Sequence, residues 1–188
     1  ISDETTQIFK DLGFFKLLQP ARYGGYEYGF TGFMDLISEI GRGCTSSAWG
    51  CALGLIHQWL LATLPKQAQD DVWLENPQAI LCGSYAPATR AVRADGGYLI
   101  KGKWSFASNV DNSQWALLGV HFPVTLPSDK PSAGFLLVPR NDWVIEDDWH
   151  VMGQSGTGSK SIVMTTDVFV PEHRKITFAE LSSGSPPG

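Results

Sequence analysis

The chain has 188 residues, of which 43% are hydrophobic and 18% charged, and its formal net charge is −5. This composition is typical of a globular protein with a sizeable core, no apolar run approaches the length needed to cross a membrane, and the acidic balance gives no support for nucleic-acid binding. Cys44, Cys51 and Cys82 lack C-x-x-C spacing, so neither a disulfide framework nor a metal site is predicted, and a reducing cytoplasm is expected.

Residues 1–78 are predicted to form a helical domain. Ser2 is a candidate N-cap, and acidic residues follow it in the first turn. The apolar residues Ile8, Leu12 and Phe15 then recur at helical spacing, which indicates a first helix.

Three further helices are predicted in this domain. Thr31 can cap a second helix that ends at Gly41 or Gly43. The third helix, over residues 46–63, is apolar on nearly every side and is therefore expected to be buried. The fourth helix covers residues 66–73, after one proline that suits a helix start and before another that stops it.

The hydrophobic period changes at residue 79, and residues 79–176 are predicted to form a β domain. Short β-rich runs alternate with turn residues, and Asp95-Gly96 stands where a hairpin turn is expected. The predicted class is therefore α+β, with a helical domain followed by an antiparallel β-barrel or sandwich. The predicted strands cover residues 79–86, 97–106, 114–122, 133–140 and 161–170.

The stretch MGQSGTGSKS, residues 152–161, looks at first like a phosphate-binding loop. A P-loop needs its lysine directly after the last glycine, but here Ser159 separates Gly158 from Lys160. A P-loop also opens a helix, whereas the residues that follow here are β-rich and end at a proline. The stretch is therefore not predicted to be a P-loop.

His57 is the first candidate for chemistry, because it stands among apolar residues of the third predicted helix. One interpretation is a core histidine whose ring nitrogens find local partners. The other is a histidine in an apolar pocket, where an ordinary pKa of about 6.5 makes the imidazole a natural proton acceptor at neutral pH. These residues alone leave both interpretations open.

The stretch GKWSFASN, residues 102–109, is the second candidate. Trp104 and Phe106 alternate with small polar residues and lead to Ser108 at a predicted strand end, which suits a planar ligand that needs flat apolar walls. A half-buried edge strand would give the same pattern. Ser84 stands similarly where a strand gives way to a turn, whereas the acidic cluster EDDWH is interpreted as a solvated turn.

Eight motifs in a fixed order give a more specific signal than these single residues. The chain contains, in sequence order, LGFFKLLQPARYGG, SSAWG, IHQWLLATLP, QDDVW, GSYAP, DGGYLIKGKWSFAS, GTGSK and DVFVPEHR. In this order they resemble the two-component flavin-dependent monooxygenases that share the acyl-CoA dehydrogenase fold, and especially the hydroxylases of 4-hydroxyphenylacetate and of steroid-derived phenols. The resemblance covers nearly the whole chain.

This resemblance implies a fold and a reaction. The family has an N-terminal helical domain, a central β-barrel and a C-terminal four-helix bundle, so residues 177–188 are expected to be a linker toward a bundle that is absent from this sequence. A separate NAD(P)H:flavin reductase supplies reduced FMN or FAD, which reacts with O2 to give a C4a-hydroperoxide that hydroxylates a phenolic substrate. The family precedent is a homotetramer, and a cytoplasmic location is expected.

The resemblance also assigns residues to the cofactor. Ser108 is expected near the N5 edge of the flavin, with Trp104, Phe106 and Asn109 beside the ring. Relatives usually have glycine at the position of Asn109, which puts the local backbone in doubt.

On the substrate side, the resemblance assigns His57 to the phenol, where it helps to remove the proton, and places Ser84 and Trp49 nearby. GTGSK is expected to be a turn near the active-site face. Many relatives have arginine at the position of Ser155, so a charged interaction with the cofactor or with a neighbouring subunit is not expected in this chain.

Two other functions remain open. An acyl-CoA dehydrogenase shares this fold, but such enzymes usually carry a Thr-Glu-Pro-x-x-Gly-Ser-Asp run on the first barrel strand, which CGSYAPATRA lacks. Their catalytic glutamate lies in the absent C-terminal half. The second alternative is a homologue that binds flavin or another ligand without catalysis.

Overall fold

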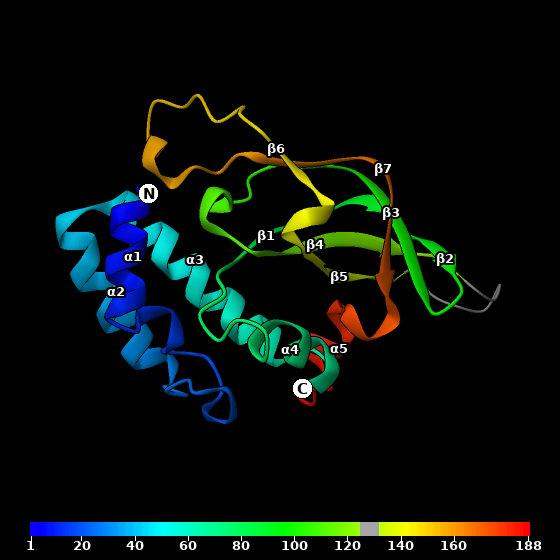
Figure 1. Ribbon diagram of the computed structural model, residues 1–188, viewed down its shortest axis with the longest axis horizontal. Helices are drawn as coiled ribbons and strands as arrows, with labels where there is room; N and C mark the ends of the chain where they lie inside the picture. The colour runs from blue at the N-terminus through cyan, green and yellow to red at the C-terminus, as the bar shows by residue number, and fades with distance from the viewer. Residues whose placement is uncertain (125–131) are drawn as a thin grey trace.

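The computed structural model describes residues 1–124 and 132–188. Over these residues, four helices precede the strands and one short helix follows them (Figure 1). The predicted α+β class with a helical N-terminal part is therefore confirmed. The helices are α1 (Asp3–Asp11), α2 (Phe30–Gly43), α3 (Thr45–Ala62), α4 (Lys66–Trp73) and α5 (Phe178–Ser182).

The ends of the first two helices agree only in part with the predicted caps. Ser2 caps α1 as predicted, because its Oγ accepts a hydrogen bond from the backbone N–H of Thr5 at 3.2 Å. The predicted cap Thr31 is wrong, since α2 begins at Phe30 and its N-cap is Gly29, two residues earlier. Glycine is an acceptable N-cap without any side-chain hydrogen bond. The helix then runs to Gly43, the second of its two predicted ends.

The helix α1 buries a different set of side chains from the one that its apolar spacing suggests. Ile8 and Leu12 are 50% and 59% exposed, whereas Phe9 is buried. Phe9 packs against Phe15, with 6.4 Å between the ring centroids, and both join an apolar cluster that includes Leu55 of α3. The tertiary position of α1 against α3 thus overrides the period of the sequence.

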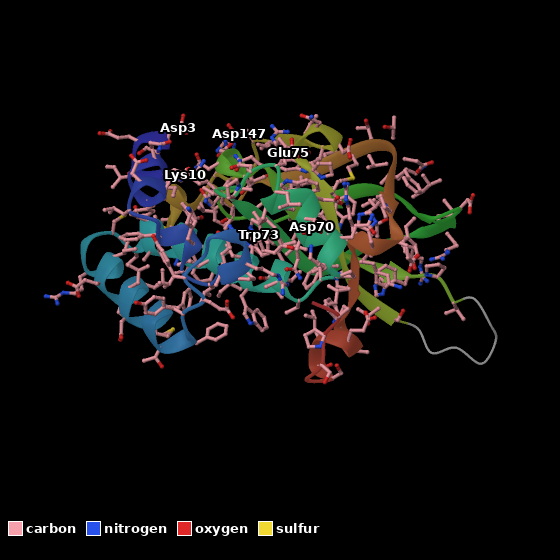
Figure 2. The ribbon with its side chains drawn as sticks, turned by 60° about the horizontal axis from the view of Figure 1, so that its bottom comes forward. Asp3, Lys10, Asp70, Trp73, Glu75 and Asp147 are labelled. Carbon is pink, nitrogen blue, oxygen red and sulfur yellow. The ribbon has the colours of Figure 1, made fainter. Side chains whose placement is uncertain are left out.

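The helix α3 is the central helix, with α1 and α2 on one side and the sheets on the other (Figure 1). Most of its residues are buried, as predicted. At its C-terminal part it packs against α4, where the indole Nε1 of the buried Trp73 donates to Gln58 Oε1 at 3.0 Å (Figure 2).

The described residues form two four-stranded sheets, with the strand orders β1-β4-β5-β8 and β2-β3-β7-β6. All five predicted strands are present, whereas the short β2, β6 and β8 were not predicted, because three residues show no period. The strands are β1 (Leu81–Arg90), β2 (Val92–Ala94), β3 (Gly97–Trp104), β4 (Trp115–Phe122), β5 (Ser132–Pro139), β6 (Val144–Glu146), β7 (Ser161–Pro171) and β8 (Lys175–Thr177).

The two sheets pack face to face instead of closing into the expected barrel. The strand pairs are antiparallel except β1 with β4, which is parallel. The hairpin β2–β3 lies in the second sheet, so the chain leaves the first sheet after β1 and re-enters it at β4 in the same direction. The predicted hairpin turn is confirmed, because Ala94 pairs with Gly97 around Asp95-Gly96 and Gly96 has φ of 72°.

Three apolar clusters hold these layers together. One lies among α1, α2 and α3, the second between α3, α4 and the first sheet, and the third between the two sheets. The third cluster contains the fully buried Trp104. The site described below is formed where the helical layers meet the ends of the strands.

The predicted domain limits at residues 78 and 176 stay predictions. In the segment predicted to be a linker, Thr177 and Glu180 form a capping box at the start of α5, and the Phe178 ring lies 5.1 Å from that of Phe135. Among the described residues, no helix combines the length and the apolar character needed to cross a membrane.

Candidate active site

A cavity of about 490 Å³ lies between α3, the irregular part of β1, the loop after β3 and the segment between β6 and β7. This volume is in the range of small-molecule sites, about 300–1,000 Å³. Its lining consists of Trp49, Leu53, His57, Gly83, Ser84, Tyr85, Ala86, Ser105, Phe106, Ser108, Trp149, Gln154 and Ser159.

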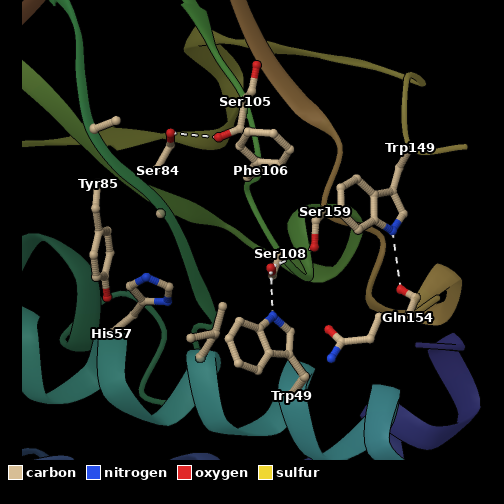
Figure 3. A pocket seen from close by; sticks show the side chains of 13 residues that line it. Trp49, His57, Ser84, Tyr85, Ser105, Phe106, Ser108, Trp149, Gln154 and Ser159 are labelled. Carbon is tan, nitrogen blue, oxygen red and sulfur yellow. Dashed lines mark hydrogen bonds between the residues drawn. The ribbon is translucent and has the colours of Figure 1, made fainter. Parts of the chain in front are cut away.

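One face of α3 supplies the first wall (Figure 3). Trp49, Leu53 and His57 are spaced by four residues, so their side chains lie on the same side of the helix. The indole Nε1 of Trp49 donates to Ser108 Oγ at 3.0 Å. Two of the predicted site residues, from segments far apart in sequence, are thus joined directly.

His57 is 1% exposed, and neither of its ring nitrogens has a hydrogen-bond partner. Burial lowers the pKa of His57 to about 4, although backbone groups of Leu81 and Leu53 partly oppose this shift. The imidazole is therefore neutral at pH 7. The core interpretation with locally satisfied nitrogens is not what the structure shows, and neither is a base with an ordinary pKa.

Gly83 on β1 is what allows His57 to lie so close to the sheet. A Cβ atom at this position would stand 2.6 Å from His57 Nε2 and 3.0 Å from the Leu117 carbonyl oxygen. Only glycine fits this approach without displacing the imidazole.

The strand β1 supplies the second wall through an irregularity in its pairing. Its register with β4 shifts between Ser84 and Thr89, so Ser84, Tyr85 and Ala86 are turned toward the cavity. Ser84 Oγ donates to the Ser105 carbonyl oxygen at 2.7 Å. The Tyr85 ring stands edge-on to His57, with 5.6 Å between the centroids.

The loop after β3 brings Ser108 to the cavity. Ser108 Oγ lies 2.7 Å from Ser159 Oγ, which in turn lies 2.7 Å from Thr157 Oγ1. Phe106, 71% exposed, lines the cavity with its ring, and its φ of 64° turns the chain away from the strand direction.

Two residues predicted to contact the cofactor do not line the cavity. Trp104 lies in the core between the sheets, where its Nε1 donates to the Gly119 carbonyl oxygen at 2.8 Å. The expected alternation with Phe106 is wrong, because β3 ends at Trp104 and the backbone then leaves the extended conformation. Asn109 is buried, and its Oδ1 accepts from Asn112 Nδ2 at 2.9 Å.

The backbone conformation of Asn109 shows how asparagine can stand where relatives usually have glycine. Its φ is 61°, in the left-handed region that glycine adopts freely and asparagine tolerates better than most residues. Asparagine therefore holds the chain after Ser108 in a conformation that glycine can also adopt.

The segment between β6 and β7 supplies the outer wall, which was not predicted. Trp149, Gln154 and Ser159 line the cavity from this segment, and Ser159 belongs to the predicted GTGSK turn. The rejection of a P-loop is confirmed, because β7 and not a helix follows the glycines. The acidic cluster is more than a solvated turn, since Asp148 accepts hydrogen bonds from Ser161.

The described lining contains no Lys, Arg, Asp or Glu. Its polar groups are four serine hydroxyls, including that of Ser108, together with one neutral imidazole, one phenol, one amide and two indoles. Such a set suits a planar ligand without charge at the ring, because the walls are flat and the few hydrogen-bonding groups can fix its orientation.

Comparisons with known proteins agree with this geometry. Residues 1–77 match the family model of the acyl-CoA dehydrogenase N-terminal domain. The oxygenase component of an FADH2-dependent resorcinol hydroxylase from a Rhizobium species is 46% identical over 179 residues, which make up 95% of this chain and 43% of that protein. The chain is a homologue of the oxygenase components of flavin-dependent monooxygenases. The resemblance seen in the sequence is therefore confirmed.

Solved structures show the same similarity. The 3-HSA hydroxylase from a Rhodococcus species has a TM-score of 0.92 at 36% identity, over 100% of this chain and 48% of that one. XiaF from a Streptomyces species, solved with FADH2 and glycerol, has a TM-score of 0.87 at 28% identity, over 100% and 48% of the two chains. The chain thus spans about half the length of the relatives that it matches.

Proposed function

We propose that this chain is part of the oxygenase component of a two-component monooxygenase that uses reduced flavin and O2 to hydroxylate a phenolic substrate. The observation that carries the proposal is the uncharged cavity, in which His57, Ser84, Trp49 and Ser108 come together from three separate elements. The homologues named as resorcinol hydroxylase and p-hydroxyphenylacetate 3-hydroxylase support a phenolic substrate.

The cavity fits the ring of a flavin better than its phosphates. Trp49, Phe106 and Trp149 offer flat apolar surfaces, and the Ser108 hydroxyl offers one hydrogen-bonding group next to them. A bound reduced flavin supplies the electrons that activate O2 for transfer of one oxygen atom to the substrate. Because the described lining has no cation, the proposal leaves the phosphates outside this cavity. The proposed cofactor is reduced FMN or reduced FAD.

His57 is proposed to hold the substrate phenol. A neutral imidazole has one acceptor nitrogen, and in His57 that nitrogen has no protein partner. Its lowered pKa of about 4 makes full removal of the phenol proton unfavourable, since a phenol has a pKa of about 10. His57 therefore accepts a hydrogen bond from the phenol hydroxyl, which makes the phenol ring more electron-rich. Ser84 and Tyr85 line the same part of the cavity as His57.

The proposal includes an NAD(P)H:flavin reductase as the partner, because the relatives at 46% and 37% identity are named as an oxygenase component and an oxygenase subunit. A homotetramer and a cytoplasmic location remain predictions. The effect of serine in place of arginine at position 155 also remains a prediction, and Ser155 begins a short 3₁₀ turn directly after Gln154 of the lining.

The test is product analysis with the full-length protein, a flavin reductase, NADH, isotopically labelled O2 and a panel of phenols. We expect a hydroxylated product that carries one labelled oxygen atom. His57→Gln should lower the yield of product per NADH by about tenfold, the value of one hydrogen bond of about 1.4 kcal/mol, while hydrogen peroxide rises. His121→Gln, at an exposed histidine of β4, is the matched control.

Absence of product from every phenol would contradict the proposal. Oxidation of an acyl-CoA with an electron acceptor would instead identify the acyl-CoA dehydrogenase alternative. Flavin binding without either reaction would identify a non-catalytic homologue.

A further inference from the structure

Three buried hydroxyl groups form a chain that ends at the cavity. Ser108 Oγ lies 2.7 Å from Ser159 Oγ, and Ser159 Oγ lies 2.7 Å from Thr157 Oγ1. Ser108 lies between Ser159 and Trp49, whose indole Nε1 donates to Ser108 Oγ at 3.0 Å (Figure 3). Ser108 and Ser159 line the cavity, whereas Thr157 does not. The chain therefore has one inner end and one end that faces a ligand.

The inner end of the chain fixes the direction of one hydrogen bond. Thr157 is 0% exposed, and within residues 1–124 and 132–188 its hydroxyl has Ser159 Oγ as its single hydrogen-bond partner. If Thr157 accepted from Ser159, its own proton would be buried without a partner, which is costly. The Thr157 hydroxyl therefore donates to Ser159. It fills one of the two acceptor positions of Ser159 Oγ.

The bond between Ser159 and Ser108 can run in either direction. A serine hydroxyl has one proton and two acceptor positions, and Trp49 fills one acceptor position of Ser108. If Ser159 donates to Ser108, the Ser108 proton points into the cavity. If Ser108 donates to Ser159, Ser108 keeps one free acceptor position, and the Ser159 proton points into the cavity instead. Rotation of two hydroxyl groups interconverts the arrangements, and no O–H bond breaks.

The two arrangements suit different ligand atoms. In the first, Ser108 has both acceptor positions filled and can only donate to the ligand. In the second, Ser108 can accept from an N–H group of the ligand. Under the proposed function a flavin ring lies next to Ser108, and N5 of this ring is a bare acceptor when oxidised and carries a hydrogen when reduced. The two serines together therefore complement both forms of the ring.

We propose that Ser159 is a positioning residue that lets Ser108 change from donor to acceptor, so that Ser108 can hydrogen-bond to the flavin ring in its oxidised and in its reduced form. This inference rests on the proposed function, since it concerns the cofactor of the same cavity. It goes further because it assigns a role to the segment between β6 and β7. Ser159 acts through Ser108 and not by its own contact with the ring.

The experiment measures the dissociation constants of oxidised and of anaerobically reduced flavin, as FMN and as FAD, for the full-length protein and its variants. In the described part of the chain, Ser108 Oγ has no hydrogen-bond partner besides Trp49 and Ser159. In Ser159→Ala, Ser108 can still donate to an acceptor, but its proton loses its partner when Ser108 accepts from an N–H group.

We expect Ser159→Ala to raise the dissociation constant of reduced flavin by about tenfold, as a buried donor without a partner implies. The constant of oxidised flavin should change by less than about twofold. The ratio of the two constants is the readout, because a general loss of stability would weaken both alike. Ser159→Thr keeps a hydroxyl group at this position and should retain the ratio of the parent.

Ser113→Ala is the matched control. It removes an equally buried serine hydroxyl, which donates to the Asn109 carbonyl oxygen at 2.9 Å and does not line the cavity. The ratio should not change in this variant. Ser108→Ala should weaken the binding of both forms. Adding Ser159→Ala to it should leave the ratio of Ser108→Ala unchanged, because Ser159 acts through Ser108.

An unchanged ratio in Ser159→Ala, with a thermal midpoint close to that of the parent, would overturn the inference. A further change of the ratio in the double variant would also overturn it, since Ser159 would then contact the ring by itself. The readout separates this inference from the proposed function. If the ratio changes as expected but no phenol is hydroxylated, only the proposed function fails, and if hydroxylation occurs with an unchanged ratio, only the inference fails.

Discussion

The unusual state of His57 dominates the site at the scale of single residues. A histidine that is almost fully buried and lacks partners at both nitrogens costs free energy, because buried polar groups are normally hydrogen-bonded. Gly83 leaves room for the imidazole, since a Cβ atom there would stand 2.6 Å from Nε2. We interpret this cost as the consequence of keeping one acceptor free for a ligand.

The buried histidine predicts a specific pH dependence of stability. The folded-state pKa of about 4 lies below the ordinary value of 6.5, so the unfolded chain binds the proton more readily. The free energy of unfolding should therefore fall as the pH drops below about 6.5 and level off below about 4, with a His57 contribution on the order of 2 kcal/mol between pH 7 and pH 5. Urea unfolding at both pH values measures it.

His57→Gln should remove this part of the pH dependence, whereas His121→Gln should retain it. Equal slopes for the parent and His57→Gln would show that the imidazole takes up its proton in the folded state as easily as in the unfolded state. That result would contradict the buried, neutral histidine described above.

The residues of the site could be predicted only in part. His57, Ser84 and Trp49 lie in the cavity as the motifs suggested, because they stand on long elements that the sequence defines well, and Ser108 lies there four residues after the end of β3. The four-residue spacing on α3 would also have identified Leu53. Trp149, Gln154 and Ser159 were missed, since a loop side chain is positioned by tertiary contacts that no local period reports.

At the scale of elements, the cavity is formed where regular structure ends. The irregular pairing of β1, the end of β3 and the segment before β7 all turn side chains out of the sheet pattern. The five longer strands and the four N-terminal helices were predictable from their apolar patterns and their start and stop residues, although the spacing in α1 pointed to side chains that are exposed. The packing of two separate sheets was not, because the parallel pairing of β1 with β4 depends on where the hairpin β2–β3 lies.

Trp104 provides a test at this scale, because it links the sheets and not the cofactor. Trp104→Phe removes the donor to the Gly119 carbonyl oxygen and leaves a small void, so unfolding should become easier by about 2 to 4 kcal/mol. Affinity for reduced flavin should change little. Trp59→Phe, at a half-exposed indole of α3, is the control and should stay within about 0.5 kcal/mol. If Trp104→Phe weakened flavin binding and left stability unchanged, Trp104 would be a cofactor contact and not a core residue.

At the scale of the whole molecule, three apolar layers stack from α1 and α2 to the second sheet. The cavity lies beside the middle layer, where α3 meets the first sheet, so its walls from α3 and β1 rest on well-packed elements. The order of helices and strands followed from the sequence. The cavity itself did not, because it arises from how these layers meet.

The most direct measurement is a crystal structure of the full-length protein with anaerobically reduced FMN or FAD and a phenol. We predict that the flavin ring lies in the cavity within hydrogen-bonding reach of Ser108 Oγ, and that the phenol hydroxyl contacts a ring nitrogen of His57. A flavin bound elsewhere, or a cavity filled by another part of the chain, would contradict the account.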